Sequence, residues 1–348
     1  MDTVYILEPG SYLRREGSTL KVVKEGRIID QIPSDGLKRL MLVGYVSLSG
    51  GVLDFLIKNR VETIFITPTG RFRARLVLDE HRHVTLRTAQ YQKLSDENFA
   101  LKTAGQIVIG KLSNMHRLLI IRARHYQDDS IRNAALRLSA IKRAVLDSRN
   151  SDVLRGLEGA AARIYYGAFR HMIRNESFPF NGRNRRPPLD PVNAMLSFVY
   201  TLLTNEVLSA IKACGLDPYL GSLHEVSYGR PSLACDLVEE YRSFLGDRLV
   251  LGLINRKAVK PDDFISRKPP PAECVDEIEM KSRRPVEMKP AIIRAFVSAY
   301  EQMMMRQIFY EPTEKKIEYR WLIMNQVRQF GKYLEDPAKG YRPFVWEN

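Results

Sequence analysis

The spacing of apolar residues changes near residue 90 of this 348-residue chain, and that change limits the folds open to it. Before this point, short runs rich in β-branched and aromatic residues are separated by glycine turns, which is typical of strands. The runs are residues 4–7, 19–23, 27–31, 39–43 and 63–67, with hairpin turns at residues 16–17 and 25–26. Residues 49–59 favour one short helix with Ser49 as its N-cap.

From about residue 95 onward, apolar side chains recur at three- and four-residue spacing, which predicts helices. The expected helices are residues 98–127, 130–147, 152–174, 190–214, 232–245, 247–256, 290–305 and 316–335. We therefore predict an α+β fold, with a small β-rich domain over residues 1–90 and a larger mainly α-helical domain over residues 91–348. The Pro/Lys-rich segment 257–290 favours a surface loop whose role the sequence does not indicate.

The charge balance points to a polyanionic partner. The chain has 54 Lys plus Arg against 40 Asp plus Glu, a formal net charge of +14, which favours nucleic acid, with an acidic lipid surface as the alternative. We expect no membrane span, because no apolar run approaches roughly 20 residues, and we expect no signal peptide at the N-terminus. The three cysteines form no CxxC pair. We therefore expect a cytoplasmic protein.

A histidine and several carboxylates lie close together in residues 221–242, GSLHEVSYGRPSLACDLVEEYR. His224 precedes Asp236 by twelve residues, and Glu239 and Glu240 follow within one helical turn, so these carboxylates can project as neighbours. Imidazole together with carboxylates suits Mn²⁺, Zn²⁺ or a Mg²⁺ site that also accepts Mn²⁺. The alternative is a solvated helix start beside an unrelated histidine.

Glu158 is a further candidate ligand. It shares one face of the predicted helix 152–174 with Ala161 and Tyr165, and the small side chains on that face let another element approach. A carboxylate there is costly to bury unless it is paired, protonated or bound to a cation. A buried ion pair with Arg155 or Arg163 is the alternative.

Two groups of arginines are candidates for contact with phosphate. The first alternates with apolar residues in a predicted strand, and the second lies in the proline-stiffened loop 181–188. These are Arg71, Arg73 and Arg75 in the strand, and Arg183, Arg185 and Arg186 in the loop. A solvated edge strand and a solvated loop remain the alternatives.

The region from residue 180 to residue 242 reads FNGRNRRPPLDPVNAMLSFVYTLLTNEVLSAIKACGLDPYLGSLHEVSYGRPSLACDLVEEYR. It resembles the core of the CRISPR-associated adaptation integrase, the spacer-acquisition endonuclease common to CRISPR systems. The matching positions are Glu158, Asn193, the turn 215–221, His224, Asp236 and Glu239. LINRKAVKPDDF, YRWLIMNQVRQFGKYL and YRPF extend the resemblance to nearly the whole chain.

The resemblance implies a metal-dependent enzyme that joins the 3′-hydroxyl ends of short DNA fragments into a CRISPR array by transesterification. Glu158, His224 and Asp236 would be catalytic and hold Mg²⁺ or Mn²⁺, with Glu239 as a further candidate ligand. Tyr165 and the loop arginines would position DNA. We expect the Glu158 and Asp236 oxygens and a His224 ring nitrogen to converge on one point even without metal, with a raised pKa for at least one carboxylate.

The resemblance also implies partners: a homodimer formed through the β-rich domains, a small CRISPR adaptation protein, the double-stranded DNA fragment and CRISPR repeat DNA. Two other functions remain open from the residues alone. One is a stand-alone metal nuclease for branched DNA, and the other is a non-catalytic, DNA-binding architectural protein. The sequence indicates neither the CRISPR subtype, the target, the fragment length, nor whether one or two ions act.

Overall fold

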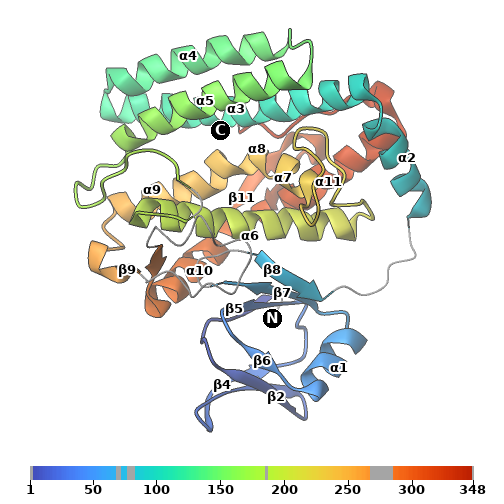
Figure 1. The fold of residues 1–348 in the computed structure, drawn as a ribbon, viewed down its shortest axis with the longest axis vertical. Coiled ribbons are helices and arrows are strands. Elements are labelled where there is room, and N and C mark those ends of the chain that lie inside the picture. Colours follow the sequence, from blue (N-terminus) through green and yellow to red (C-terminus); the bar gives the residue numbers. More distant parts are fainter. Residues whose placement is uncertain (1–2, 68–71, 77–82, 185–186, 267–284, 347–348) are drawn as a thin grey trace. The chain divides into compact units, whose positions relative to one another are not determined.

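The computed structural model describes residues 3–67, 72–76, 83–184, 187–266 and 285–346. Strands dominate the part before residue 77 and helices the part after residue 83 (Figure 1), so the predicted α+β fold is confirmed. The chain divides into two compact units that interleave along the sequence. The first comprises Met1–His81, Arg186–Thr201 and Asp262–Val297, and the second Arg82–Arg185, Leu202–Pro261 and Ser298–Asn348. The domain boundary near residue 90 stays a prediction.

Two four-stranded sheets form the N-terminal part of the first unit. One has the order β1-β5-β7-β8, with β1, β5 and β7 parallel and β8 antiparallel to β7. The other has the order β4-β3-β2-β6. The strands are β1 (Thr3–Ile6), β2 (Tyr12–Glu16), β3 (Thr19–Lys24), β4 (Arg27–Pro33), β5 (Arg39–Val43), β6 (Ser47–Leu48), β7 (Glu62–Ile66) and β8 (Phe72–Leu76).

The turns and the short helix of this part follow the sequence. Helix α1 (Gly50–Lys58) begins after Ser49, whose side chain accepts a hydrogen bond from the amide of Val52. The β3–β4 turn places Glu25 and Gly26 at positive φ, as a two-residue hairpin turn requires. Alternating inward residues of the strands pack with α1 in one apolar core.

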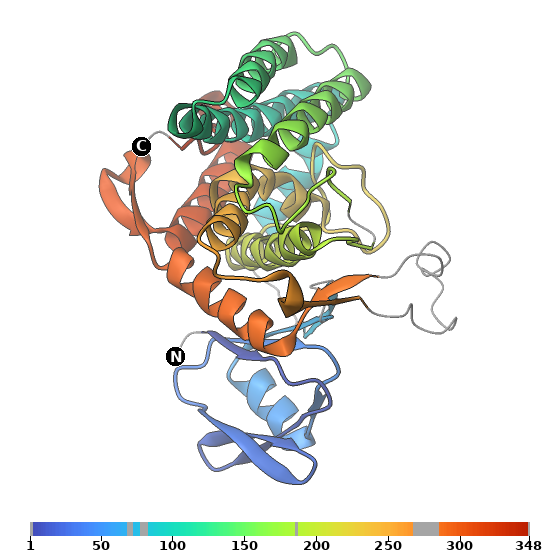
Figure 2. The same cartoon turned by 90° about the vertical axis from the view of Figure 1, so that its left-hand side faces the viewer.

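The helices of the chain are α2 (Val84–Leu94), α3 (Glu97–Tyr126), α4 (Asp129–Val145), α5 (Ser151–Met172), α6 (Pro191–Ala213), α7 (Ser232–Leu237), α8 (Glu239–Tyr241), α9 (Arg248–Asn255), α10 (Pro290–Met304) and α11 (Tyr319–Glu335). In the second unit α3, α4 and α5 pack side by side (Figures 1 and 2), and α8 packs on α3. The long α3 therefore brings α5 and α8 to one place. The sequence analysis did not predict α2.

Residues 232–255 form a broken helical run, where the sequence predicted two helices over 232–245 and 247–256. A π-helical turn, η1 (Arg242–Asp247), separates α8 from α9 and contains the predicted break at residue 246. Turns of this kind occur frequently at functional sites. Apolar periodicity gave no sign of the π-helical geometry, because every residue from Ser243 to Asp247 is buried.

Two short strand pairs lie between the last helices of the chain. Strand β9 (Phe264–Ser266) pairs with β10 (Val286–Met288), and β11 (Gln307–Tyr310) pairs with β12 (Lys315–Glu318). The helix that we predicted over residues 316–335 therefore begins three residues later than expected, at Tyr319. Single 3₁₀ turns are η2 (Pro261–Asp263), η4 (Glu311–Thr313) and η5 (Pro337–Lys339).

Helix α6 is long and apolar enough, by length and composition alone, to cross a membrane, although the sequence analysis found no apolar run of that length. Its most apolar window has a mean hydropathy of 1.4, and 78% of that window is buried inside the protein. Core helices pass the same test, so this burial accounts for its apolar character.

Candidate active site

Three helices of the second unit bring two glutamates to one lysine. Helix α5 begins after Asn150, which caps the amide of Val153, and presents Glu158 two turns later. The ammonium of Lys111 on α3 contacts Oε1 of Glu158 and lies 2.8 Å from Oε2 of Glu239, at the start of α8. We call Glu158, Glu239, Lys111 and Arg242 the carboxylate cluster.

Burial makes the pairing within this cluster necessary. The side chains of Lys111 and Glu239 are 5% and 2% exposed, whereas Glu158 is 26% exposed. The Arg242 guanidinium lies 3.0 Å from the other oxygen of Glu239, Oε1. An ionised carboxylate this deep in the protein needs such partners.

The pKa values in the cluster follow from these contacts. Burial alone would raise the pKa of Glu239, but Arg242, Lys111 and His224 together lower it to about 2. Burial likewise favours the neutral form of Lys111, yet Glu239 and Glu158 raise its pKa above the ordinary value. The pKa of Glu239 is therefore lowered in spite of its burial, because the protein supplies its own cations.

One oxygen of the cluster forms an ion pair but accepts no hydrogen bond. Oε2 of Glu239 is fully buried and accepts no hydrogen bond, although the Lys111 ammonium is 2.8 Å away. Both observations hold, since an ion pair at this distance does not require hydrogen-bond angles. An oxygen that faces only a positive charge is well suited to binding a cation.

His224 lies beside the cluster and is oriented by Asp236. Its ring Nδ1 is 2.7 Å from Oδ1 of Asp236, which also accepts the His224 amide at 3.0 Å. The second oxygen of Asp236 accepts the amides of Ser222 at 2.6 Å and Leu223 at 2.9 Å. Because the carboxylate acts as the acceptor throughout, Nδ1 is the donor, which leaves Nε2 as the ring nitrogen that can offer a lone pair to a ligand.

The loop before His224 requires a glycine at residue 221. A Cβ atom there would lie 2.4 Å from Oδ2 of Asp236 and 2.8 Å from the carbonyl carbon of Ser232. Only glycine therefore lets the loop close over Asp236, which is fully buried.

The expected convergence of Glu158, His224 and Asp236 is not seen. Within the described residues, no three His, Cys, Asp or Glu side chains stand close enough together to hold an ion as they are arranged. Asp236 is saturated by amides and by the His224 ring, and Lys111 takes the cation position between Glu158 and Glu239. The residues nevertheless fit a metal, because two carboxylates already share one cation beside an oriented imidazole.

Sequence reasoning missed Lys111 and Arg242. Lys111 lies in an otherwise apolar and buried stretch of α3, beside Gly110 and Leu112, and a lysine in such a stretch signals a buried charge with a partner. Arg242 follows Glu239 by one helical turn, a spacing that predicts their ion pair.

The C-terminal segment packs against the same helices. Tyr341 donates a hydrogen bond to Glu240, and the amide of Phe344 donates to the other oxygen of Glu240 at 2.7 Å. Burial raises the pKa of Glu240 to about 8, although both hydrogen bonds act to lower it. Asn114 of α3 binds the carbonyls of Glu240 and Phe344 and the amide of Trp346. Glu240 thus anchors the chain end and is no candidate ligand.

The residues predicted to contact DNA differ in their exposure and in their partners within the protein. Tyr165 is fully buried and donates a 2.5 Å hydrogen bond to Asp247, so it does not reach the surface in this structure, and its contact with DNA stays a prediction. The Arg75 side chain is 4% exposed and lies 3.4 Å from Glu62, which removes it as a phosphate ligand too. The exposed Arg73 stacks on Tyr45, with 5.0 Å between the guanidinium carbon and the ring centre.

The remaining candidates lie in or beside undescribed positions. The guanidinium of Arg183 donates to the carbonyl oxygen of Asn184 and is partly exposed. Arg71, Arg185 and Arg186 lie outside the described residues. Their predicted contacts with DNA stay predictions.

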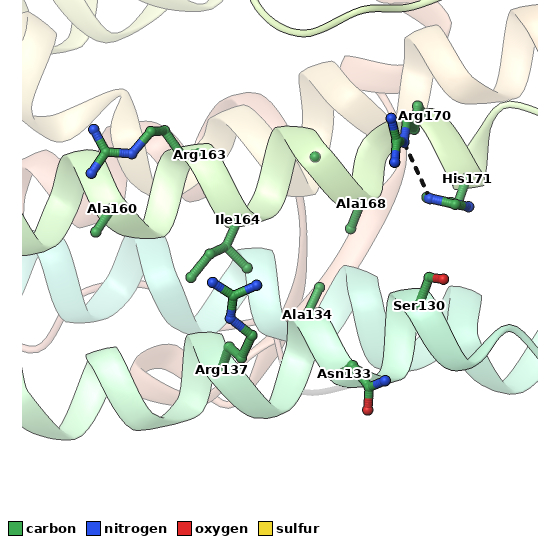
Figure 3. A pocket seen from close by; sticks show the side chains of 11 residues that line it. Ser130, Asn133, Ala134, Arg137, Ala160, Arg163, Ile164, Ala168, Arg170 and His171 are labelled. Carbon is green, nitrogen blue, oxygen red and sulfur yellow. Dashed lines mark hydrogen bonds between the residues drawn. The ribbon is translucent and has the colours of Figure 1, made fainter.

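A basic groove runs between α4 and α5, with a volume of about 460 Å³. Figure 3 shows Arg137 rising from α4 toward Ile164, with the Arg170–His171 hydrogen bond at one end. Among the described residues, no carboxylate lines this groove, which we call the α4–α5 groove. Its polar lining residues are Ser130, Asn133, Arg137, Arg163, Arg170 and His171.

Comparison with known proteins assigns the chain to a family. The family model described as CRISPR associated protein Cas1 matches residues 4–279. CRISPR-associated endonuclease Cas1 1 of Chlorobaculum tepidum is 33% identical over 352 aligned residues, which cover 99% of this chain and 98% of that protein. The chain therefore belongs to the CRISPR-associated Cas1 family, and the predicted resemblance is confirmed.

Solved structures agree on the fold. A CAS1 protein from Thermotoga maritima superposes with a TM-score of 0.78 at 26% identity, with 100% of each chain covered. A casposase bound to integration product gives a TM-score of 0.83 at 22% identity, covering 100% of this chain and 95% of that one. At the lower identity the likeness shows the fold alone.

Proposed function

We propose that this protein is a metal-dependent DNA integrase and endonuclease that joins the 3′-hydroxyl ends of short DNA fragments into a CRISPR array by transesterification. The observation that carries the proposal is the carboxylate cluster, in which one buried cation is shared by Glu158 and Glu239 beside an oriented imidazole. Family membership supports the choice of DNA as the substrate class. The same cluster in a protein without such relatives would support only a cation site.

Glu158, Glu239 and Nε2 of His224 are the groups that would hold Mg²⁺ or Mn²⁺. Carboxylate oxygens suit both ions, and the imidazole favours Mn²⁺. When bound, such an ion supplies Lewis-acid polarisation of a phosphate and stabilises the charge that develops on the leaving oxygen. Glu239 thereby takes the ligand position that the sequence analysis gave to Asp236.

Asp236 acts through His224. Its carboxylate holds Nδ1–H at 2.7 Å and three backbone amides, so it fixes both the tautomer and the ring orientation. Outer carboxylates of this kind raise the basicity of a ligand imidazole, and their loss typically costs about 10- to 100-fold in metal affinity or activity. Asp236 is thus a positioning residue in this proposal.

The α4–α5 groove offers a surface for the DNA backbone. Arg137, Arg163 and Arg170 are exposed and line a groove that contains no carboxylate. Arginine forks bind phosphate oxygens, and such contacts fix the register of DNA without reading its sequence. Arg73 on β8 and the loop arginines near residue 185 are further candidates.

The remaining parts of the proposal rest on the family. We propose a homodimer formed through the β-rich parts, assembly with a small CRISPR adaptation protein, and a location in the prokaryotic cytoplasm. The CRISPR subtype, the target sequence and the role of residues 257–290 are left open.

The decisive assay supplies a short duplex with free 3′-hydroxyl ends, a supercoiled plasmid that bears a repeat array, and either Mg²⁺ or Mn²⁺. Joined product is the expected result. Cut plasmid without joining would replace the proposal by a stand-alone nuclease, and a mobility shift alone would replace it by an architectural protein. Glu225→Gln serves as the matched control, since Glu225 is exposed, adjacent to His224 and paired with Arg155.

A further inference from the structure

Lys111 stands where a metal ion would otherwise bind. Its ammonium contacts carboxylate oxygens of both Glu158 and Glu239, the two glutamates to which we assign ligand roles. The side chain is 5% exposed, so water contributes little to neutralising these groups. Arg242, by contrast, approaches Glu239 at its other oxygen and has no contact with Glu158 among the ion pairs of the described residues.

The charges of the carboxylate cluster already balance without metal. Glu158 and Glu239 carry two negative charges, and Lys111 and Arg242 carry two positive ones. A divalent ion added to this set would leave an excess of positive charge in a buried place, which is unfavourable at low effective dielectric. One of the two side-chain cations therefore has to leave its contact when an ion enters.

Lysine is the group that can leave. Its charge is carried at the end of a flexible four-carbon stem, so the ammonium can move without displacement of α3, whereas a guanidinium is a rigid fork. The helix itself is fixed by the neighbouring contacts: a Cβ atom at Gly110 would lie 2.5 Å from Pro343, and Asn114 holds the C-terminal segment.

We propose that Lys111 is an intrinsic counter-ion: it holds Glu158 and Glu239 together in the metal-free protein and competes with the divalent ion for them. The inference rests on the proposed function, because it concerns the same site. It has two consequences. The three helices stay assembled without metal, and the affinity for metal is lower than the donor set alone would give.

The test is the affinity of the full-length protein for Mn²⁺, measured by isothermal titration calorimetry, in wild type and Lys111→Met. Methionine keeps an unbranched, flexible side chain that is one atom shorter than lysine, and it removes the charge. We expect Mn²⁺ to bind about tenfold more tightly to the variant, since a nearby positive charge no longer opposes the ion. The variant should also melt at a lower temperature in EDTA and gain more from Mn²⁺ than wild type.

Two further variants keep the test decisive. Lys111→Gln serves if the methionine variant fails to fold, because glutamine still donates hydrogen bonds, and it should show the same tightening. Lys102→Met is the control, an exposed lysine on the same helix, and should bind Mn²⁺ like wild type. Equal or weaker Mn²⁺ binding in the folded Lys111 variants overturns the inference. Wild-type protein that binds no Mn²⁺ at all contradicts the proposed function instead.

Discussion

In the carboxylate cluster, Lys111 is buried and contacts two glutamates, whereas Arg137 of the α4–α5 groove is exposed and no carboxylate lines that groove. The first cation satisfies groups inside the protein. The second leaves its donors available to a ligand. The net charge of +14 counts both alike, so composition predicts an anionic partner but does not say which cations meet it. Burial and partners decide that question.

The largest effect should come from the cluster, where Glu239→Gln removes one negative charge from a buried pair of carboxylates. We expect strand joining to fall by about 10³-fold, which corresponds to the several kcal/mol that a metal ion contributes to the transition state. DNA affinity should stay close to wild type. Gel analysis of joined product, with Glu225→Gln as control, measures the difference. Near-normal joining would show that Glu239 holds no ion.

Asp236→Asn should have a smaller effect, because the residue acts through His224. We expect about 10- to 100-fold weaker Mn²⁺ binding, measured at a temperature where circular dichroism shows the variant folded. Ser222→Ala is the control, since it removes only a hydroxyl 3.5 Å from Asp236. The affinity of Glu239→Gln for Mn²⁺ is measured in the same way. If Mn²⁺ affinity falls as far in Asp236→Asn as in Glu239→Gln, Asp236 is a direct ligand after all.

In the groove, joint replacement of Arg137, Arg163 and Arg170 by glutamine should weaken DNA binding without changing Mn²⁺ affinity. Three lost phosphate contacts should reduce the slope of log affinity against log salt by about 2 to 3. Fluorescence anisotropy at several salt concentrations gives that slope. Arg132→Gln on α4 is the control, because Arg132 is paired with Asp129. An unchanged slope would show that these three arginines do not contact the phosphates of DNA.

The smallest effect concerns the pH dependence of stability through Glu240. Its pKa is about 8 in the folded protein against an ordinary value of 4.5, so the folded state keeps a proton that the unfolded chain releases between these values. This contribution to stability is complete below pH 4.5 and is lost as the pH rises through 8.

Wild type should therefore lose a few degrees of melting temperature relative to Glu240→Gln between pH 6 and pH 8. Differential scanning calorimetry at matched ionic strength measures this difference. Glu335→Gln, at an exposed glutamate, should follow wild type. Parallel pH profiles for wild type and Glu240→Gln would show that Glu240 is ionised in the folded protein.

Local patterns predicted much of the fold. Apolar periodicity located α3, α4 and α5 to within two residues at each end, and turn glycines located the β2–β3 and β3–β4 hairpins. The predicted helices 232–245 and 247–256 also located a break at residue 246, but the geometry of that break was not predictable in this way. The π-helical turn at Arg242–Asp247 keeps every position from Ser243 onward buried, so periodicity carries no sign of its wider winding.

The candidate site was predicted in part for a similar reason. Motif spacing identified Glu158, His224, Asp236 and Glu239, but spacing does not show which carboxylate points at which neighbour. The loop that closes at Gly221 delivers three amides to Asp236, and α3 delivers Lys111 from more than forty residues before Glu158. Both facts depend on tertiary packing, and our proposal that Glu239, not Asp236, is a direct metal ligand rests on them.

The most direct test of this account is the position of Mn²⁺, found by anomalous diffraction from a crystal grown or soaked with the ion. We predict a single strong peak about 2.1 Å from oxygens of Glu158 and Glu239 and from Nε2 of His224, with the Lys111 ammonium withdrawn from between them. Asp236 should keep its hydrogen bond to Nδ1. A peak bound directly by Asp236, or an ion that leaves Lys111 in contact with both glutamates, would contradict it.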